Sequence, residues 1–397
     1  MRTLMIAPQP FFQPRGTPFS VLHRLKALSH LGYKTDLLTY HLGEDVAIDG
    51  VAIHRIPRVP LVNKIAIGPS KSKLVLDICL YRKALRMLRS GHYDLIHSHE
   101  EAGFFATRLS RKFNTLHLYD MHSSLPQQLS NFQFSKSKIL IDTFESLEAL
   151  TINHADAVIT ICPELYHYVK ERFPQKFNML IENVADNSLV FASQVDSETI
   201  RRRLQTNGES VVLYAGTFEP YQGIDLLIES SSRIIERHRQ VRFVLVGGKP
   251  EQVEQYKSMV NNLKLADYFV FTGSVLPDEV PAYIAASDVL VSPRVAGNNT
   301  PLKIYSYLRS GKPIVATNHI THTQVLDSKV AVLTECDPQS FSEGVLTVLN
   351  DADVRARIAA NAQRLAGEKY GYDAYLTKTK EVYQFLEKKL ITGRATN

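Results

Sequence analysis

One stretch in the second half of the chain constrains the fold more than any other. An apolar strand over Val289–Ser292 runs into a short polar loop, a helix over Pro301–Ser310 follows, and a second strand begins at Ile314–Ala316. A strand, a helix and a strand in this order predict one crossover unit of a parallel α/β sheet. The stretch also predicts a surface loop at the carboxyl end of its first strand, where α/β sheets bind ligands.

The helix in this stretch has signals for both of its ends. Thr300 suits the N-cap, Pro301 suits the first helical position, and Gly311 suits the left-handed residue that ends a helix. A helix N-terminus after a strand is an anion site, because its backbone N–H groups are unpaired. Arg294 and Lys303 flank it and supply positive charge. The alternative is an ordinary crossover with a surface loop.

Length and composition predict two domains and no membrane span. A chain of 397 residues exceeds what one core usually holds. No uninterrupted apolar run approaches the roughly 18 residues that a transmembrane helix needs, and the apolar run at the N-terminus is too short for a signal peptide. The net charge of +6 indicates an anionic partner, and no motif supports nucleic acid. The three cysteines lack metal-site spacing, as expected of free thiols in a reducing cytoplasm.

Strand-like and helix-like segments alternate along the whole chain, which is typical of parallel α/β layers. The strands predicted in the first half are Leu4–Ala7, Lys34–Thr39, Leu95–His97, Leu116–Tyr119 and Ala157–Ile161, and the helices are Phe19–His30, Ser72–Ser90 and Ser137–Ala149. The further strands predicted in the second half are Val211–Gly216, Val241–Gly247, Phe269–Thr272 and Ala331–Leu333, and the further helices are Ile224–His238, Glu251–Leu263, Asp278–Ala286 and Pro338–Asn350.

A polar segment separates the two halves. We predict a first domain over residues 1–185, a linker over 186–209, a second domain over 210–370 and a C-terminal helix over 371–397 that returns to the first domain. Two doubly wound halves of this kind would bind a ligand between the carboxyl ends of their strands.

Eight short motifs in a fixed order resemble those of retaining GT-B glycosyltransferases of family GT4. They are Pro14-Arg-Gly16-Thr-Pro, Asp94-Leu-Ile-His97-Ser-His99, Tyr119-Asp-Met-His122, Asp156-Ala-Val-Ile-Thr-Ile, Ile181-Glu-Asn183-Val-Ala-Asp186, Leu213-Tyr-Ala-Gly216 with Gly223-Ile-Asp225, Phe243-Val-Leu-Val-Gly-Gly248 and Phe271-Thr-Gly273-Ser-Val275. The resemblance covers nearly the full length of the chain. It implies two Rossmann-like domains that face each other across a cleft, and transfer of a sugar from a nucleotide diphosphate sugar without a metal or a cofactor.

The resemblance also implies a set of donor-binding positions. In this sequence they are Arg15, Gly16, Gly216, Thr217, Gln222, Gly247, Gly248, Val275, Asn298, Asn299, Thr300, Pro301, Leu302 and Ser306.

Four of these positions depart from the family pattern. Thr217 and Gln222 stand where the family has a phosphate-binding Arg and Lys, and Asn298 and Ser306 stand where it has two glutamates. Loss of the two cations removes charge stabilisation from the leaving diphosphate, usually a large contribution to catalysis. Arg294 and Lys303, with Arg15, are predicted to replace them; the alternative is a weakened or inactive site.

The resemblance assigns His122 to the donor sugar, and together with Arg294 and Lys303 it completes the predicted catalytic set. Its alternative is a buried structural histidine. Glu100, Glu101 and Asp120 also follow strands and are predicted to steer the acceptor, with solvated loop carboxylates as the alternative. Because the leaving phosphate is thought to accept the acceptor's proton in such enzymes, no dedicated general base is expected.

The helix over Lys71–Arg89 is apolar on one side and carries six cations against one acid. In related enzymes with lipid-linked acceptors such helices touch the anionic leaflet, which predicts a cytoplasmic protein that is peripheral on the inner face of the plasma membrane. The alternative is a plain surface helix with its apolar face in the core.

The sequence thus predicts transfer of a sugar to a glycan or lipid-linked glycan, with UDP as first and GDP as second choice of donor nucleotide. A sugar-nucleotide-binding or assembly protein without turnover is the second hypothesis, and an epimerase or phosphorylase of the same fold is the third. No recognisable lysine site for the pyridoxal cofactor of a phosphorylase is present.

Overall fold

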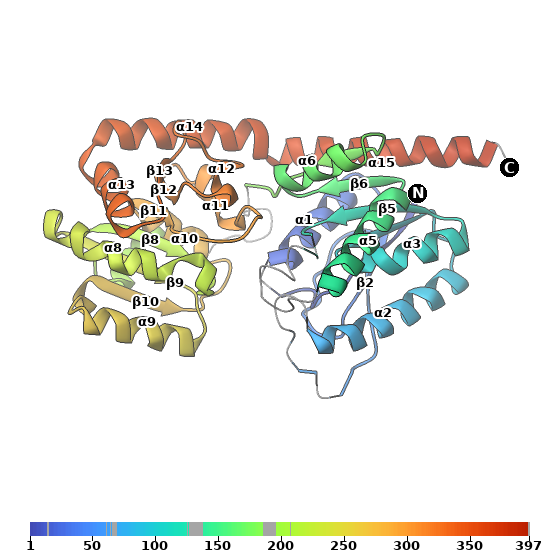
Figure 1. Cartoon of the computed structure of the whole chain (residues 1–397), viewed down its shortest axis with the longest axis horizontal. Helices are drawn as coiled ribbons and strands as arrows, with labels where there is room; N and C mark the ends of the chain where they lie inside the picture. Colours follow the sequence, from blue (N-terminus) through green and yellow to red (C-terminus); the bar gives the residue numbers. More distant parts are fainter. Residues whose placement is uncertain are drawn as a thin grey trace. The chain divides into compact units, whose positions relative to one another are not determined.

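The computed structural model describes residues 1–13, 16–60, 62–63, 65, 70–124, 126, 138–185, 196–206 and 208–395. The chain divides into two compact units, one formed by Met1–Asn183 with Asp373–Asn397 and the other by Val184–Tyr372. Each unit has one parallel sheet with helices packed against it (Figure 1).

The first unit contains a seven-stranded sheet in the order β3-β2-β1-β4-β5-β6-β7, in which all neighbours are parallel. Its strands are β1 (Arg2–Ala7), β2 (Lys34–Thr39), β3 (Val51–Arg55), β4 (Leu95–His99), β5 (Leu116–Met121), β6 (Ala157–Thr160) and β7 (Asn178–Leu180). Its helices are α1 (Gly16–His30), α2 (Lys71–Ser90), α3 (Ala102–Phe113), α5 (Lys138–His154), α6 (Pro163–Arg172) and α15 (Tyr372–Ala395). The strand order reverses direction between β1 and β4, which is the topological switch point of this sheet.

The second unit contains a six-stranded parallel sheet in the order β10-β9-β8-β11-β12-β13. Its strands are β8 (Ser210–Ala215), β9 (Val241–Val246), β10 (Phe269–Gly273), β11 (Val289–Ser292), β12 (Ile314–Thr317) and β13 (Val332–Thr334). Its helices are α7 (Ser197–Arg203), η1 (Pro220–Gln222), α8 (Ile224–Arg237), α9 (Pro250–Asn262), η2 (Ala266–Tyr268), α10 (Val280–Ala286), α11 (Leu302–Arg309), α12 (Ile320–Thr323), α13 (Pro338–Asn350) and α14 (Ala352–Tyr370).

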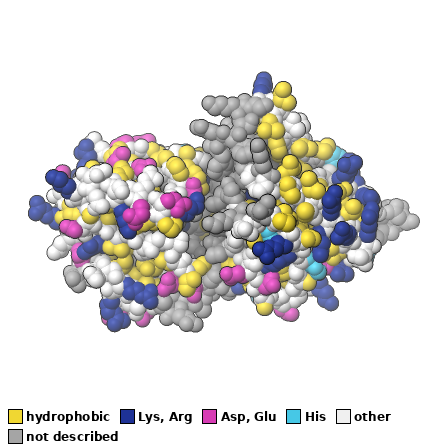
Figure 2. All heavy atoms as spheres, turned by 90° about the horizontal axis from the view of Figure 1, so that it is seen from below, with side chains coloured by type: hydrophobic (Ala, Val, Ile, Leu, Met, Phe, Trp, Pro, Cys, Tyr) yellow, Lys and Arg dark blue, Asp and Glu magenta, His cyan; other side chains and the backbone are white. Residues whose placement is uncertain are grey.

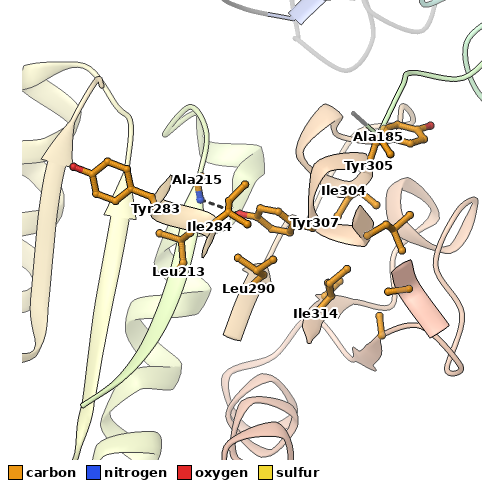
Figure 3. Close-up of a cluster of buried hydrophobic side chains, with 14 of the residues drawn as sticks. Ala185, Leu213, Ala215, Tyr283, Ile284, Leu290, Ile304, Tyr305, Tyr307 and Ile314 are labelled. Carbon is orange, nitrogen blue, oxygen red and sulfur yellow. Dashed lines mark hydrogen bonds between the residues drawn. The ribbon is translucent and has the colours of Figure 1, made fainter. Parts of the chain in front are cut away.

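The core of the second unit fixes α11 against the sheet. Ile304, Tyr305 and Tyr307 on this helix are almost completely buried among Leu213, Leu290 and other apolar side chains (Figure 3). The Tyr307 hydroxyl accepts a hydrogen bond of 3.0 Å from the backbone N–H of Ala215, drawn as the dashed line in Figure 3. The bond ties α11 to the carboxyl end of β8, where the loop that contains Gly216 begins.

Part of the segment predicted as a linker is a packed helix. Within 186–209, the described residues form α7, which begins at the N-cap Asp196, whose carboxylate accepts from the Thr199 N–H at 2.7 Å. Ile200 is fully buried in the core of the second unit. Two of the three arginines form ion pairs, Arg201 with Asp288 and Arg203 with Glu279, so the polar composition reflects a salt-bridged helix as well as a connection.

None of the helices in the described part of the chain combines the length and apolar character that crossing a bilayer requires.

Candidate active site

The ends of β4 and β5 in the first unit carry a buried polar cluster. The pattern follows from strand periodicity, because His97 and His99 share one face of β4, and His99 lies directly opposite Asp120 of β5. The ring nitrogen Nδ1 of His99 lies 2.9 Å from Nε2 of His122, and Nε2 of His97 lies 3.3 Å from a carboxylate oxygen of Asp120.

Arg24 of α1 supplies the positive charge of this cluster. Its Nε lies 3.1 Å from Asp120, and it donates a 3.0 Å hydrogen bond to the Thr379 hydroxyl of α15. Although burial opposes ionisation, Arg24 and the neighbouring histidines hold the pKa of Asp120 well below its usual value. Burial lowers the pKa values of His97, His99 and His122, so these rings are neutral at pH 7.

These contacts define the surroundings of Asp120 and His122. The solvated-loop alternative is wrong for Asp120, because its side chain is 1% exposed and ion-paired. His122 is also buried, as its structural alternative predicted, and its Nε2 lies 3.3 Å from Asp120.

His97, His99 and Asp120 have the residue types of a metal site. The rings of His97 and His99 are stacked with planes 16° apart, so their nitrogen lone pairs do not converge well on one point, and Arg24 already balances the carboxylate.

Glu100 and Glu101 belong to a second, half-buried cluster in the first unit. Glu100 has a left-handed backbone (φ 48°) and accepts a 3.1 Å hydrogen bond from Thr17 of α1. Glu101 lies 3.6 Å from Lys73 of α2. Burial and the charge of Glu101 raise the pKa of Glu100 to about 7, and burial with Glu101 does the same for Asp77. These acids therefore exchange protons near neutral pH.

The glycine loop after β1 is described only in part. Gly16 begins α1, is exposed, and has open space around the position that a Cβ would take. Arg15, predicted as a substitute cation, lies outside the described residues.

In the second unit, the start of α11 differs by one residue from the prediction. The N-cap is Pro301, the helix begins at Leu302, and the Thr300 hydroxyl is buried without a hydrogen-bond partner among the described residues. Thr300 makes no cap because Pro301 takes an extended ψ of 135°, which places the helix start one residue later. The predicted end is confirmed: Gly311 is left-handed, with φ 72°.

Arg294 and Lys303 lie together at this edge of the second sheet. The Lys303 Nζ atom is buried 3.6 Å from the centre of the Tyr214 ring, and the Arg294 guanidinium lies 5.0 Å from the centre of the Tyr221 ring. A Cβ on Gly216 would come within 3.2 Å of Lys303 Nζ, so this amine lies directly beside the exposed loop after β8.

Among the described residues, neither Arg294 nor Lys303 has an acidic partner. Arg294 donates from Nε to the Ala296 carbonyl at 2.8 Å, and Lys303 Nζ makes no hydrogen bond within the described part of the chain. Burial, followed by repulsion from Arg294, holds the pKa of Lys303 well below its ordinary value. Burial also lowers the pKa of Arg294, and no carboxylate in the described ranges shifts the pKa of either group. Two partly desolvated cations beside a helix N-terminus can bind a phosphate or diphosphate group.

Buried His322 of α12 holds the Arg294 loop in place. Its Nδ1 lies 2.9 Å from the Thr317 carbonyl, so this nitrogen carries the proton and Nε2 accepts from the Ser292 hydroxyl at 2.8 Å. The Thr317 hydroxyl donates to the Arg294 carbonyl. Burial lowers the pKa of His322 to about 3, so it adds no charge beside the two cations at pH 7.

The remaining predicted donor residues surround this cation pair or form nearby loops. Tyr214 donates from its hydroxyl to the carbonyl of exposed Thr217 at 2.7 Å. Gln222 is buried in η1, and its Oε1 has no partner among the described residues. Gly247 takes a positive φ of 119° and approaches the Gly216 carbonyl so closely that a Cβ would lie 1.9 Å from it. Gly248 packs on Phe218 in the same way.

Four other predicted donor positions lie against the core, in the loop before α11 or on α11 itself. Val275 packs against the core of the second unit. The Asn298 carbonyl accepts a 2.6 Å hydrogen bond from Gln324, and Asn299 is half-buried in the same loop. Ser306 is half-buried one turn after Leu302 on α11.

The sequence analysis missed residues that surround Asp120 and one residue that lies beside Lys303. Arg24 contacts Asp120, Thr379 contacts Arg24 and Tyr383 contacts His97, and no local pattern brings these distant parts of the chain together. Tyr214 could have been found from the sequence, because it is an aromatic residue near the end of a strand that precedes a glycine loop.

Comparisons with known proteins identify the family of this chain. The family model for glycosyl transferases group 1 matches residues 196–365, and the model for glycosyltransferase family 4 matches residues 14–183. The chain is a family 4 glycosyltransferase.

Two relatives and one solved structure show how far the likeness extends. The enzyme is 26% identical to mannosylfructose-phosphate synthase of Agrobacterium fabrum over 335 residues, 77% of this chain and 71% of the relative. It is 21% identical to phosphatidyl-myo-inositol mannosyltransferase of Mycobacterium tuberculosis over 401 aligned residues, 97% of both chains. The structure of Anabaena HepE in complex with UDP and glucose matches with a TM-score of 0.74 at 19% identity, covering 97% of this chain and 99% of that chain. The fold is therefore GT-B, as predicted.

Proposed function

We propose that this glycosyltransferase moves a hexose from a nucleotide diphosphate sugar, with retention of configuration, to a glycan or lipid-linked glycan acceptor. The observation that carries the proposal is the Arg294–Lys303 pair, two partly buried basic groups with no acidic partner within the described residues. Such a pair suits a diphosphate leaving group, whose negative charge grows as the bond to the sugar breaks.

The local surroundings strengthen this assignment. The helix dipole of α11 adds partial positive charge at its N-terminus, beside Thr300. His322 and the aromatic rings of Tyr214 and Tyr221 are neutral, so Arg294 and Lys303 are the groups here that can face a bound phosphate with positive charge. A desolvated cation acts more strongly on a phosphate than an exposed one does, because the local dielectric is low.

The same pair compensates for two of the departures from the family pattern. Thr217 and Gln222 are uncharged, so they cannot balance a diphosphate. Arg294 and Lys303 come from the loop after β11 and from α11 and supply the charge from a different direction. Ser306 offers a neutral hydroxyl where the family has a glutamate, which predicts weaker recognition of the ribose hydroxyls.

The choice of donor and acceptor draws on the relatives. UDP is the first choice of nucleotide because the HepE structure contains UDP, and GDP is the second. A lipid-linked acceptor is favoured because one full-length relative is named for transfer to phosphatidyl-myo-inositol. We assign Glu100 and Glu101 to the acceptor side, where carboxyl oxygens can hydrogen-bond with sugar hydroxyls. No metal or cofactor enters the proposal.

Helix α2 supports a cytoplasmic, membrane-associated enzyme. Leu76 and Leu80 are buried in the core, whereas Leu74, Val75 and Ile78 are 66%, 49% and 48% exposed. Arg82, Arg86 and Arg89 are also exposed and continue this surface along the helix. Figure 2, seen from below, shows hydrophobic side chains next to Lys and Arg side chains on the face of the first unit. An apolar patch beside cations suits the anionic surface of the inner leaflet.

A binding and turnover series tests the proposal. The melting temperature is measured with UDP, GDP, ADP and their sugars, because a ligand that binds the folded state raises apparent stability. The sugars that stabilise the enzyme are then incubated with it, and release of free nucleoside diphosphate is followed. Stabilisation by a UDP-sugar together with release of UDP supports the proposal. Binding without release with any lipid or glycan acceptor tried would favour the assembly-protein hypothesis, and the absence of any nucleotide effect would overturn both.

A further inference from the structure

We infer that Lys303 is an uncharged amine when the donor site is empty, and that it takes up one proton from solvent when a diphosphate binds. Lys303 then selects ligands by charge, since only an anionic ligand stabilises its ammonium form. The inference rests on the proposed function, because it uses the same cation pair as the diphosphate site.

The geometry around Lys303 disfavours an isolated ammonium group. Its Nζ atom is buried, makes no hydrogen bond within the described residues, and faces the Tyr214 ring. An ammonium group has three donors, and each unpaired donor in a buried place loses its hydration without compensation. A cation–π contact with the ring face offsets part of the lost hydration energy.

The charged and titratable groups around Lys303 do not favour the ammonium either. From the loop after β11, Arg294 repels it. From β8 and η1, Tyr214 and Tyr221 have raised pKa values, chiefly through burial, and stay neutral. From α12, His322 is neutral at pH 7, and burial lowers the pKa of the neighbouring His319. No carboxylate among the described residues offsets Arg294, which agrees with the strongly lowered pKa of Lys303.

A bound diphosphate reverses this balance. Its oxygens supply hydrogen-bond acceptors and at least two negative charges beside Arg294 and Lys303, and opposite charge favours the protonated amine. The amine nitrogen gains one proton from solvent and no other bond changes. A nucleoside without phosphate cannot drive this step, so the affinity gap between UDP and uridine should widen as the pH falls from about 9 to 7, as the proton becomes easier to take up.

Calorimetric titration with UDP in two buffers of different ionisation enthalpy measures the proton directly. Near pH 8 the phosphates of UDP are fully ionised, since their last pKa is near 6, so UDP itself contributes little. The expected result is a buffer-dependent enthalpy that corresponds to about one proton taken up per UDP bound. Uridine, which carries no phosphate, provides the reference without uptake.

Two variants assign the proton to Lys303. Lys303→Arg keeps a cation that cannot lose its proton, so it should bind UDP with no buffer dependence. Lys303→Met removes an unpaired buried amine, so the ligand-free protein should melt at a higher temperature while UDP binding weakens. Lys312→Met is the matched control, because Lys312 lies in the same unit near Asp288 and should leave the proton uptake unchanged.

The outcomes separate this inference from the proposed function. Tight UDP binding with the same enthalpy in both buffers overturns the inference and leaves the donor site standing. Proton uptake that persists in Lys303→Arg also overturns it, because the proton then goes elsewhere. Failure of every nucleotide to bind overturns the proposed function as well.

Discussion

Arg24 and Asp120 form an ion pair whose side chains are only 4% and 1% exposed. The pair joins α1 to the end of β5, and Arg24 extends it to Thr379 on α15. Because the carboxylate is desolvated and the adjacent histidines are neutral at pH 7, Arg24 is the group that balances its charge. A buried charge of this kind is costly once its partner is removed.

Arg24→Met should therefore destabilise the protein by about 3–5 kcal/mol, the usual loss when one member of a buried pair is removed. Denaturant unfolding of both proteins measures the difference. Arg237→Met is the matched control, because Arg237 and its partner Glu343 are 54% and 55% exposed and such pairs contribute about 0–1 kcal/mol. Equal losses of stability in the two variants would show that the buried Arg24–Asp120 pair contributes no more than an exposed ion pair.

Acid should destabilise the protein below about pH 6.5. The folded pKa values of His97, His99 and His122 are lowered, chiefly by burial, and those of His117 and His322 fall to about 3. At pH 5–6.5 unfolding therefore lets these five histidines take up protons. Glu100 and Asp77, whose folded pKa values lie near 7, release protons on unfolding and offset part of this uptake. The histidines outnumber the two acids, so stability falls as the pH falls through this window. Each such histidine contributes about 1.4 kcal/mol per pH unit. Urea unfolding at several pH values measures the slope, and a flat profile between pH 7 and 5 would contradict the assigned neutral rings.

Turnover should depend on the two cations of the second unit more than on the residues that replaced the family's Arg and Lys. Arg294→Ala or Lys303→Ala should lower kcat by at least about 100-fold, the typical loss of a charge stabiliser. Thr217→Ala and Gln222→Ala should have milder effects, since neither side chain is charged. Initial rates with a saturating donor test this order. Wild-type rates in both cation variants would show that another residue supplies the positive charge, and Arg15 would be the next residue to replace.

Much of the fold could be predicted because strand-like and helix-like segments alternate along the chain. Lys34–Thr39, Val289–Ser292 and Pro338–Asn350 have the same bounds in sequence and structure. Edge strands such as β3 were missed because they are short and half-exposed. Helix α14 was missed because its buried face consists largely of small residues, Ala359, Ala362 and Ala366, which give little apolar contrast.

The two parts of the candidate site differed in how well the sequence predicted them. Arg294 and Lys303 lie near each other along the chain, on a loop and a helix with clear end signals, so their proximity could be predicted. The environment of Asp120 could not, because long-range packing brings Arg24 and His97 to this carboxylate and Thr379 to Arg24. A carboxylate after a strand has the same local sequence whether it is solvated or ion-paired, so only the tertiary structure separates the two.

Membrane binding through α2 should require both its exposed apolar residues and its exposed cations. Each Lys or Arg near an anionic leaflet contributes on the order of 1 kcal/mol, so replacing Arg82, Arg86 and Arg89 by Gln should release the enzyme from acidic vesicles. Replacing Leu74 and Ile78 by Ser should weaken binding at all salt concentrations, whereas the cation contribution should fade as salt rises because charges beyond a Debye length are screened. Flotation with acidic and neutral liposomes at low and high salt measures both effects.

Arg108 and Arg111 on α3, replaced together, provide a control of similar charge on another helix. Equal recovery with neutral and acidic lipids, or no loss in the α2 variants, would make α2 a plain surface helix.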